Sequence, residues 1–452
     1  MTVNTKPAYP SFPEALRVWA KIGFLSFGGP AGQIALMHKE LVEDRRWISE
    51  TRFLHALNYC MLLPGPEAQQ LATYVGWLLH GWRGGVAAGV LFVLPGFFVI
   101  LALATGYALF QQLDWVASVF FGLKAAVLAI VVEALIRVAR RALKNSLSYG
   151  LATIAFLALF AFAVPFPLVV LGAGLVGYLV AKRRPDLLAG GGHKASAQAP
   201  QGSAVIDQNI SEVDPSWRRA LMVTGVWGGL WIAPLVPLVL LWGWDTTFAV
   251  IMTFFSQMAV VTFGGAYAVL AYVASEAVGT FGWLQPGEML DGLALAETTP
   301  GPLVLVLSFV GYLAGFRDAS GLPPVWGGVL GASLATWVTF VPCFLWIFLG
   351  APYIERLRSN VAIAGALAAI TAAVVGVIFN LALWFALHVI FDEVGRIEAS
   401  IISMAWPVWS TLNWSALALT LLAAVSLFVL HWGVLRTLAL SALAGVLLQL
   451  LV

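Results

Sequence analysis

The chain has 452 residues, of which 61% are hydrophobic and 10% are charged, and its formal net charge is +2. A soluble domain carries about 25% charged residues, so this composition excludes a water-soluble globular protein. Apolar runs of about 20 residues, enough to cross a bilayer as a helix, recur along the chain and are too long and unbroken for barrel strands. We therefore expect an all-α polytopic membrane protein in contact with lipid. The small net charge does not favour nucleic acid as a partner.

The first membrane segment comprises residues 13–28, which either span the membrane or re-enter it, and the sequence SFGGP begins near its end at Ser26. It follows a polar tail at 1–12, which we place in the cytoplasm and for which we expect no cleaved signal peptide. Lys21 lies inside this segment. It is either part of an anion site or an interfacial lysine on a short helix, with its ammonium group at the membrane surface.

The next apolar segment is interrupted by Pro64–Gly65–Pro66. Residues 53–63 make about 16 Å of helix and residues 67–79 about 20 Å, so neither piece crosses a membrane alone. Proline removes a backbone donor and ends the preceding helix, whereas glycine lets the chain turn. The interruption predicts one broken span or a re-entrant hairpin. Its new helix N-terminus would carry free N–H groups that suit an anion, although a purely structural kink is the alternative.

Three polar side chains follow this interruption directly. Glu67 is either a helix cap favoured by the dipole or a protonatable group that couples proton movement to anion passage. Gln69 and Gln70 carry amide groups that can donate to oxyanion oxygens without adding charge.

Lys124 lies near the middle of a later apolar span, where a lysine costs about 2.5–3.5 kcal/mol on insertion scales. We expect it to be a counter-charge for a bound anion. The structural alternatives are snorkelling to the membrane surface or pairing with Glu133.

The chain is divided by a polar stretch at 185–216 that is rich in Gly, Ala, Ser and Gln, and we expect it to be a flexible cytoplasmic linker. The expected order is a tail at 1–12, a first repeat at 13–184, the linker at 185–216, an extra transmembrane helix at 217–243 and a second repeat at 244–452.

The two halves repeat one another. Phe27 precedes Pro64 by 37 residues, and Phe263 precedes Pro300 by 37 residues. Further landmarks recur in the same order, namely Trp47 with Trp283 and Pro95 with Pro342. Equivalent loops carry opposite charge bias, basic at 137–144 and mainly acidic at 391–398, so the positive-inside rule predicts inverted repeats. The N-terminus would then be cytoplasmic and the C-terminus external.

Paired helix breaks in inverted repeats mark the central site of transporters. The candidate substrate-binding residues are Lys21, Ser26, Gly28, Gly29, Gln33, Gly65, Pro66, Gln69, Gln70, Lys124, Gly264, Gly265, Thr298, Thr299 and Gly301. The coupling candidates are Glu67 and Glu297, and the structural breaks are Pro64, Pro66, Pro300 and Pro302. We expect no catalytic residue, metal or cofactor.

Four segments, FGGPAGQIALMHKELVEDRRWI, LLPGPEAQQLATYVGW, FGG and TTPGP, resemble the signature segments of the chromate ion transporter family, in its long-chain form with two fused domains. The resemblance covers nearly the whole chain outside the linker and the tail. It implies export of chromate across the bacterial inner membrane, driven by the membrane potential or a proton gradient rather than ATP, and hence chromate resistance. It also implies competition by sulfate, a dianion of similar shape.

Two other functions remain open from the sequence. One is inward transport of sulfate or a related oxyanion. The other is a membrane-embedded enzyme acting at the helix breaks, which the sequence favours less because it shows no metal cluster, nucleophile–base pair or phosphate-binding loop. Transport direction, coupling ion and oligomeric state are not predicted.

Overall fold

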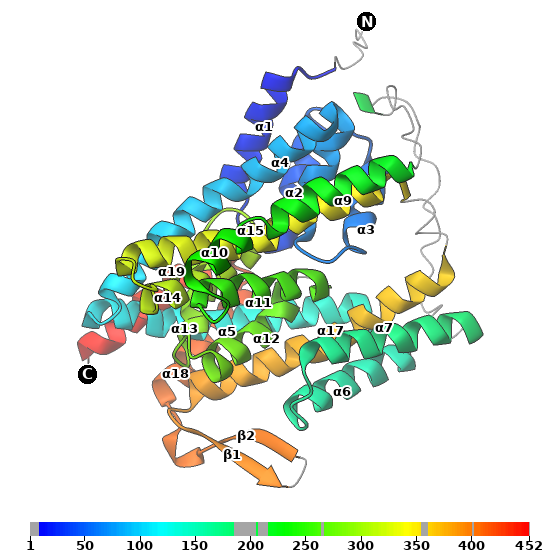
Figure 1. Cartoon of the computed structure of the whole chain (residues 1–452). Coiled ribbons are helices and arrows are strands. Elements are labelled where there is room, and N and C mark those ends of the chain that lie inside the picture. The colour runs from blue at the N-terminus through cyan, green and yellow to red at the C-terminus, as the bar shows by residue number, and fades with distance from the viewer. Residues whose placement is uncertain are drawn as a thin grey trace, which may run out of the picture.

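The computed structural model describes residues 9–184, 205–206, 216–263, 266–353, 360–399 and 402–451, and most of the described chain is helical (Figure 1). Within these ranges, 6 helical stretches are long and apolar enough to cross a membrane. They are Glu67–Phe110, Asp114–Ala142, Phe166–Arg183, Trp217–Trp242, Pro324–Gly350 and Val361–Ile390. The expected class, an all-α polytopic membrane protein, is therefore confirmed.

The first repeat contains seven named helices in the described part of the chain. They are α1 (Phe12–Leu25), α2 (Gly29–His38), α3 (Glu50–Cys60), α4 (Glu67–Phe110), α5 (Asp114–Ala142), α6 (Ser146–Phe160) and α7 (Phe166–Arg183), with a π-helical turn (Lys39–Asp44) after α2. Local sequence explains several boundaries. Ser11 caps α1 by accepting from the Glu14 N–H, and Asn145 and Ser148 form a capping box at the start of α6.

The second repeat follows the same order. Two helices precede it, α9 (Trp217–Ile232) and α10 (Leu235–Trp242). It then contains α11 (Thr247–Val261), α12 (Ala266–Ser275), a π-helical turn (Glu276–Thr280), α13 (Glu288–Thr298), a 3₁₀ turn (Leu303–Leu305), α14 (Val306–Arg317), α15 (Pro324–Gly350), α17 (Val361–Ile390), α18 (Trp414–Ala424) and α19 (Val434–Leu451). The short turns Ala351–Tyr353, Trp409–Thr411 and Val425–Val429 complete the helical segments.

The long helix α4 is in fact two arms. The backbone is non-helical at His80 and at Gly81, where φ is 60°. A Cβ added at Gly76 would lie 2.5 Å from the carbonyl oxygen of Gly84, so the arm after the turn folds back on the arm before it. The second repeat makes the same hairpin from α14 and α15, where Gly311 approaches Gly331 in the same way.

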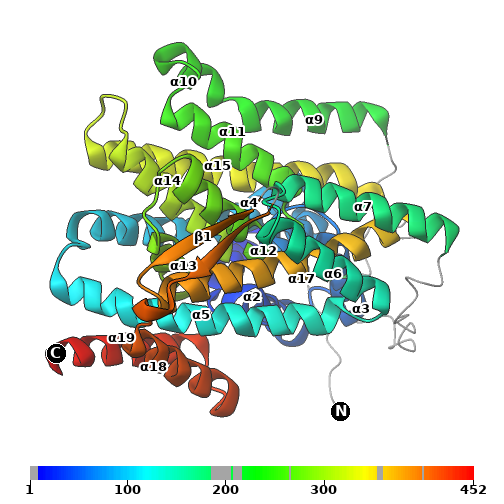
Figure 2. The same cartoon turned by 90° about the horizontal axis from the view of Figure 1, so that it is seen from below.

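The C-terminal helices of each repeat pack on the other repeat. Helices α6 and α7 pack along α17, whereas α18 and α19 pack along α5 (Figures 1 and 2). Glycines allow the backbones to touch: a Cβ at Gly122 of α5 would lie 1.9 Å from the Ser441 carbonyl oxygen, and one at Gly376 of α17 would lie 2.1 Å from that of Ala152. The two repeats therefore interlock instead of meeting at a single flat surface.

The centre of this arrangement is formed by α13 and α14. Every residue of 288–297 in α13 and of 306–315 in α14 is buried. In contrast, α9 and α10 lie along one edge of the molecule, opposite α18 and α19 (Figure 2), with large apolar side chains such as Leu240 exposed. Such a surface suits contact with lipid.

The predicted linker lies outside the described residues except for Val205, Ile206 and Ser216. The N–H groups of Val205 and Ile206 donate to the carbonyl oxygens of Arg46 and Trp47, at 3.2 and 3.0 Å. This part of the linker therefore contacts the loop after α2.

An antiparallel hairpin follows α17 and was not expected from the sequence. Its strands are β1 (Val394–Ala399) and β2 (Ile402–Pro407), with Val394 opposite Pro407. It coincides with the acidic loop at 391–398.

Candidate functional site

Both predicted helix breaks are present. Helix α3 ends at Cys60 and α4 begins at Glu67, with Gly65 between them at a φ of 114°. Helix α13 ends at Thr298, and Gly301 has a φ of 90° before the chain becomes helical again. Positive φ values are readily adopted by glycine, so each glycine is required where it stands.

Each break is hydrogen-bonded to the opposite repeat. The Gly65 N–H donates to the carbonyl oxygen of Thr262 at 2.8 Å, and the Gly301 N–H donates to that of Ser26, also at 2.8 Å. Thr262 and Ser26 are equivalent residues, each immediately before a Phe-Gly-Gly sequence. The two bonds are therefore the same contact made in both directions. They locate both breaks at the interface between the repeats.

The landmark prolines Pro95 and Pro342 each mark the helix that packs against the break of the opposite repeat. A Cβ at Gly96, which follows Pro95 in α4, would lie 2.1 Å from the carbonyl oxygen of Pro300. Similarly, a Cβ at Gly65 would lie 2.9 Å from the sulfur of Cys343, which follows Pro342 in α15. Each break therefore packs against a helix of the opposite repeat.

Two helices begin near the breaks without a side-chain cap. Gly28, in the left-handed region, precedes α2, and Pro66 precedes α4, and neither supplies a capping hydrogen bond. A Cβ at Gly28 or Gly29 would meet nothing within 4 Å. The start of α2 thus combines a positive dipole end with open space beside it, which suits an anion.

Buried amides lie at both breaks, Gln33 at the second and Gln69 and Gln70 at the first. The Gln33 side chain donates to the Gly301 carbonyl oxygen at 2.5 Å, and Gln70 donates to that of Pro64 at 2.7 Å. Gln69 makes a long contact of 3.4 Å with Thr73. The side-chain oxygens of all three glutamines lack a hydrogen-bond partner in the described structure. An unsatisfied buried polar atom costs about 1–3 kcal/mol, so this region has unused capacity for water or a ligand.

The predicted hydroxyl donors are already engaged. Ser26 donates to the Ile22 carbonyl oxygen at 2.6 Å, Thr298 to that of Leu295 at 2.8 Å, and Thr299 to that of Ala296 at 2.9 Å. Each hydroxyl satisfies its own helix end, so only its oxygen lone pairs remain available. Gly264 and Gly265 lie outside the described residues.

The two coupling candidates lie within electrostatic reach of arginines that sequence reasoning did not connect with them. Glu297 is 3% exposed, accepts a hydrogen bond from Tyr267 at 2.6 Å, and lies within electrostatic reach of Arg137. Glu67 lies within electrostatic reach of Arg141. The two arginines are four residues apart on α5 and therefore share one helix face. Their four-residue spacing in the sequence could have indicated a shared role, but the positive-inside rule already explained both charges.

Lys21 forms an ion pair. Its Nζ lies 2.5 Å from Oε1 of Glu40 in the π-helical turn after α2, and Arg45 binds the other oxygen of the same carboxylate. Burial raises the pKa of Glu40, but the hydrogen bond from Lys21 and the charges of Arg45 and Lys21 outweigh this and lower it overall. Lys21 thus connects α1 to the turn after α2, while its side chain remains 49% exposed.

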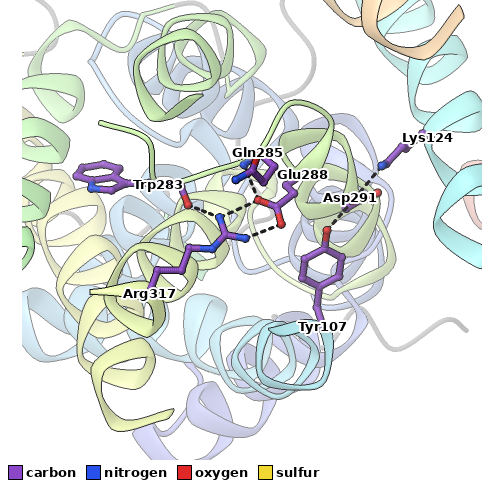
Figure 3. A network of polar contacts seen from close by, with 7 residues as sticks. All are labelled: Tyr107, Lys124, Trp283, Gln285, Glu288, Asp291 and Arg317. Carbon is purple, nitrogen blue, oxygen red and sulfur yellow. Dashed lines mark hydrogen bonds and ion pairs between the residues drawn. The ribbon is translucent and has the colours of Figure 1, made fainter. Parts of the chain in front are cut away.

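Lys124 joins the two repeats through Asp291 of α13 (Figure 3). Its Nζ lies 3.3 Å from Oδ2 of Asp291, and the Tyr107 hydroxyl donates to the same oxygen at 2.7 Å. The alternative in which Lys124 pairs with Glu133 is wrong, because Glu133 lies one turn from Arg137 and pairs with it at 2.5 Å. Asp291 was not recognised in the sequence, since only the fold brings it to Lys124.

A second ion pair fixes the segment that leads into α13. Arg317 of α14 binds both carboxylate oxygens of Glu288, at 2.7 and 2.8 Å, and donates to the Trp283 carbonyl oxygen (Figure 3). Glu288 in turn accepts from the Gln285 N–H at 2.6 Å. These contacts hold the start of α13, and hence Asp291, in a defined position.

The fold defines a class: a multi-pass α-helical membrane protein with two interlocked repeats and a broken helix in each. Comparison with known proteins identifies the family, because the family model described as chromate transporter matches residues 14–178 and 249–447. This chain belongs to the chromate transporter family.

Similar proteins align with most of the chain. It is 32% identical over 385 residues to a chromate transport protein of Pseudomonas aeruginosa, covering 83% of this chain and 82% of the relative. It is 30% identical over 395 residues to a chromate transport protein of Cupriavidus metallidurans, covering 86% of each. A probable chromate transport protein of Synechococcus elongatus is 30% identical over 378 residues, covering 83% of this chain and 84% of the relative. No solved structure matches the chain.

Proposed function

We propose that this protein is a secondary transporter that exports chromate across the bacterial inner membrane, with the oxyanion passing between the two helix breaks. Family membership supports the substrate class. The observation that carries the location is the reciprocal pair of hydrogen bonds from Gly65 to Thr262 and from Gly301 to Ser26. In an alternating-access cycle the two repeats move relative to one another. That motion would break and re-form these two bonds, because each bond joins one repeat to the other.

The charges near the breaks suit a dianion. A helix N-terminus contributes about half an elementary charge, so the uncapped ends of α2 and α4 supply roughly one positive charge. Arg137 and Arg141 carry positive charges on one face of α5, where Arg137 is also paired with Glu133. Their electrostatic contact with Glu297 and Glu67 keeps the empty site close to neutral, which lowers the cost of holding cations inside a membrane.

The membrane potential suffices as a driving force for export. Moving one elementary charge through about 100 mV is worth about 2.3 kcal/mol. A dianion leaving a negatively charged interior gains about twice that. Uptake of sulfate remains the second candidate function, because a site built from helix ends and arginines recognises charge and tetrahedral shape more than the central atom.

Chromate flux into proteoliposomes that contain only this protein tests the proposal. With a potassium diffusion potential that is positive on the receiving side, we expect flux without ATP and collapse of flux when an ionophore removes the potential. Excess sulfate on the same side distinguishes a selective site from a general oxyanion site. Flux that requires ATP under a clamped potential, or no chromate flux in vesicles that do transport sulfate, would contradict chromate export.

Inverted repeats make a separate prediction. The basic segment 137–144 and the acidic segment 391–398 occupy equivalent positions, and opposite charge bias predicts opposite sides of the membrane. Single cysteines introduced at Asn145 and Gly395, in a background without Cys60 and Cys343, should react with an impermeant reagent from the cytoplasmic and external sides respectively. Labelling of both positions from one side would refute the inversion.

A further inference from the structure

Asp291 is a buried carboxylate at the centre of the molecule with only half of its hydrogen-bonding capacity used. It is 2% exposed. Its Oδ2 accepts from Tyr107 and faces Lys124, whereas its Oδ1 has no partner in the described structure. A structural ion pair buried in a membrane would be expected to satisfy both oxygens, since each unsatisfied atom is costly there. The free oxygen is therefore a place where a proton can be added.

Lys124 lies beside a second source of positive potential. A Cβ added at Gly287, the residue before α13, would lie 3.2 Å from the Lys124 Nζ, so the ammonium group sits next to the positive end of a helix. Its side chain is 30% exposed, unlike that of Asp291. Lys124 is therefore the more accessible member of the pair, whereas Asp291 is enclosed.

Apart from Asp291, no free negative charge among the groups that act on Asp291 offsets the positive potential of Lys124 and the start of α13. The groups that act on Asp291 are Lys124 from α5, Tyr107 from α4 and Glu288 from its own helix. Glu288 is bound through both oxygens by Arg317 of α14. Asp291 alone is left to balance Lys124, so neutralising it exposes a site that attracts an anion.

We propose that Asp291 is the proton-carrying group of the transport cycle: an oxyanion that binds Lys124 displaces the Asp291 carboxylate, which takes up one proton from water on Oδ1. The inference rests on the proposed function and deepens it. One ammonium group cannot balance both a carboxylate and a dianion in a medium of low dielectric constant. The Asp291 carboxylate, once displaced from Lys124, is therefore neutralised by a proton. Glu297 differs because Arg137, the cation within its electrostatic reach, is already paired with Glu133.

Proton uptake on chromate binding tests this inference on the purified full-length protein. Chromate itself takes up protons near neutral pH, so variants are compared at one pH in weak buffer with a pH electrode. We expect the parent protein to take up nearly one more proton per bound chromate than Asp291→Asn does. The affinity of the parent for chromate should also fall by about tenfold per pH unit as Asp291 loses its proton, a dependence that the asparagine variant should lack.

Tyr107→Phe provides a second test that does not require the asparagine variant to fold. It keeps the acid but removes the hydroxyl that stabilises its charge, so the fall in affinity should begin at a higher pH. Asp318→Asn, which changes an exposed aspartate at the end of α14, serves as the matched control and should keep the proton uptake of the parent, whereas Glu297→Gln and Glu67→Gln test the two rival coupling candidates. Equal uptake by Asp291→Asn and the parent, or loss of uptake in Glu297→Gln only, overturns the inference. If the parent does not bind or transport chromate, the proposed function itself fails.

Discussion

Replacing Pro64, Gly65 and Pro66 together by alanine should reduce chromate flux in proteoliposomes to that of protein-free vesicles, while the protein still inserts into the membrane. Alanine favours helix, so α3 and the first arm of α4 would join into one continuous helix of about 45 Å. The Gly65 hydrogen bond to Thr262 would then be lost. The Cβ added at Gly65 would also lie 2.9 Å from the sulfur of Cys343, which forces the two repeats apart.

The matched control is the double replacement of Pro323 and Pro324 by alanine. These prolines start α15 in the turn after α14, where proline is merely favourable at the first helical positions. We expect the control to keep most of its flux. Full transport by the Pro64–Gly65–Pro66 variant at equal expression would show that the break is only a kink.

Lys124→Met should weaken chromate binding by about 10- to 100-fold, because a hydrogen bond to a charged group contributes about 1.5–3 kcal/mol. It should also destabilise the protein by about 3 kcal/mol, since Asp291 is left without its counter-charge. We place this cost at the low end for buried pairs because the Lys124 side chain is 30% exposed. Lys124→Arg keeps the charge in a different geometry and should keep part of the binding.

A double variant separates the two effects. Lys124→Met with Asp291→Asn removes both charges, so it should recover most of the thermal stability but none of the chromate binding. Stability is read from thermal unfolding of the purified protein and binding from equilibrium dialysis at matched ionic strength. If Lys124→Met binds chromate as tightly as the parent, Lys124 is structural and the site charge must come from elsewhere.

The helix breaks could be predicted from the sequence because their causes are local. Proline and glycine dictate the backbone wherever they occur, so the end of α3 and the start of α4 at Glu67 follow from residues 64–66 alone. Repetition of the same pattern at Pro300–Gly301–Pro302 then indicated the duplicated architecture. The separate turn at Gly81 was not expected, because a lone glycine in an apolar run has many other uses.

The partners of the charged residues could not be predicted, because they depend on long-range packing. Lys124 meets Asp291 only when α5 and α13 of opposite repeats lie together. Likewise, Lys21 was expected either in an anion site or at the membrane surface, and the sequence did not predict that the π-helical turn brings Glu40 to it. Local pattern identified the cations as costly in a membrane, whereas the identity of each counter-charge required the fold.

The crossed backbone bonds at the breaks also bear on how the chain is assembled. Each repeat, taken by itself, would leave the N–H of its break glycine and the carbonyl oxygen before its Phe-Gly-Gly sequence without partners in hydrocarbon. Each of α5 and α17 would also lack the pair of helices that covers it, because α6 and α7 cover α17 while α18 and α19 cover α5. A single repeat is therefore not an independent folding unit. We therefore expect the first half of the chain to stay incompletely packed in the membrane until the second half has been synthesised.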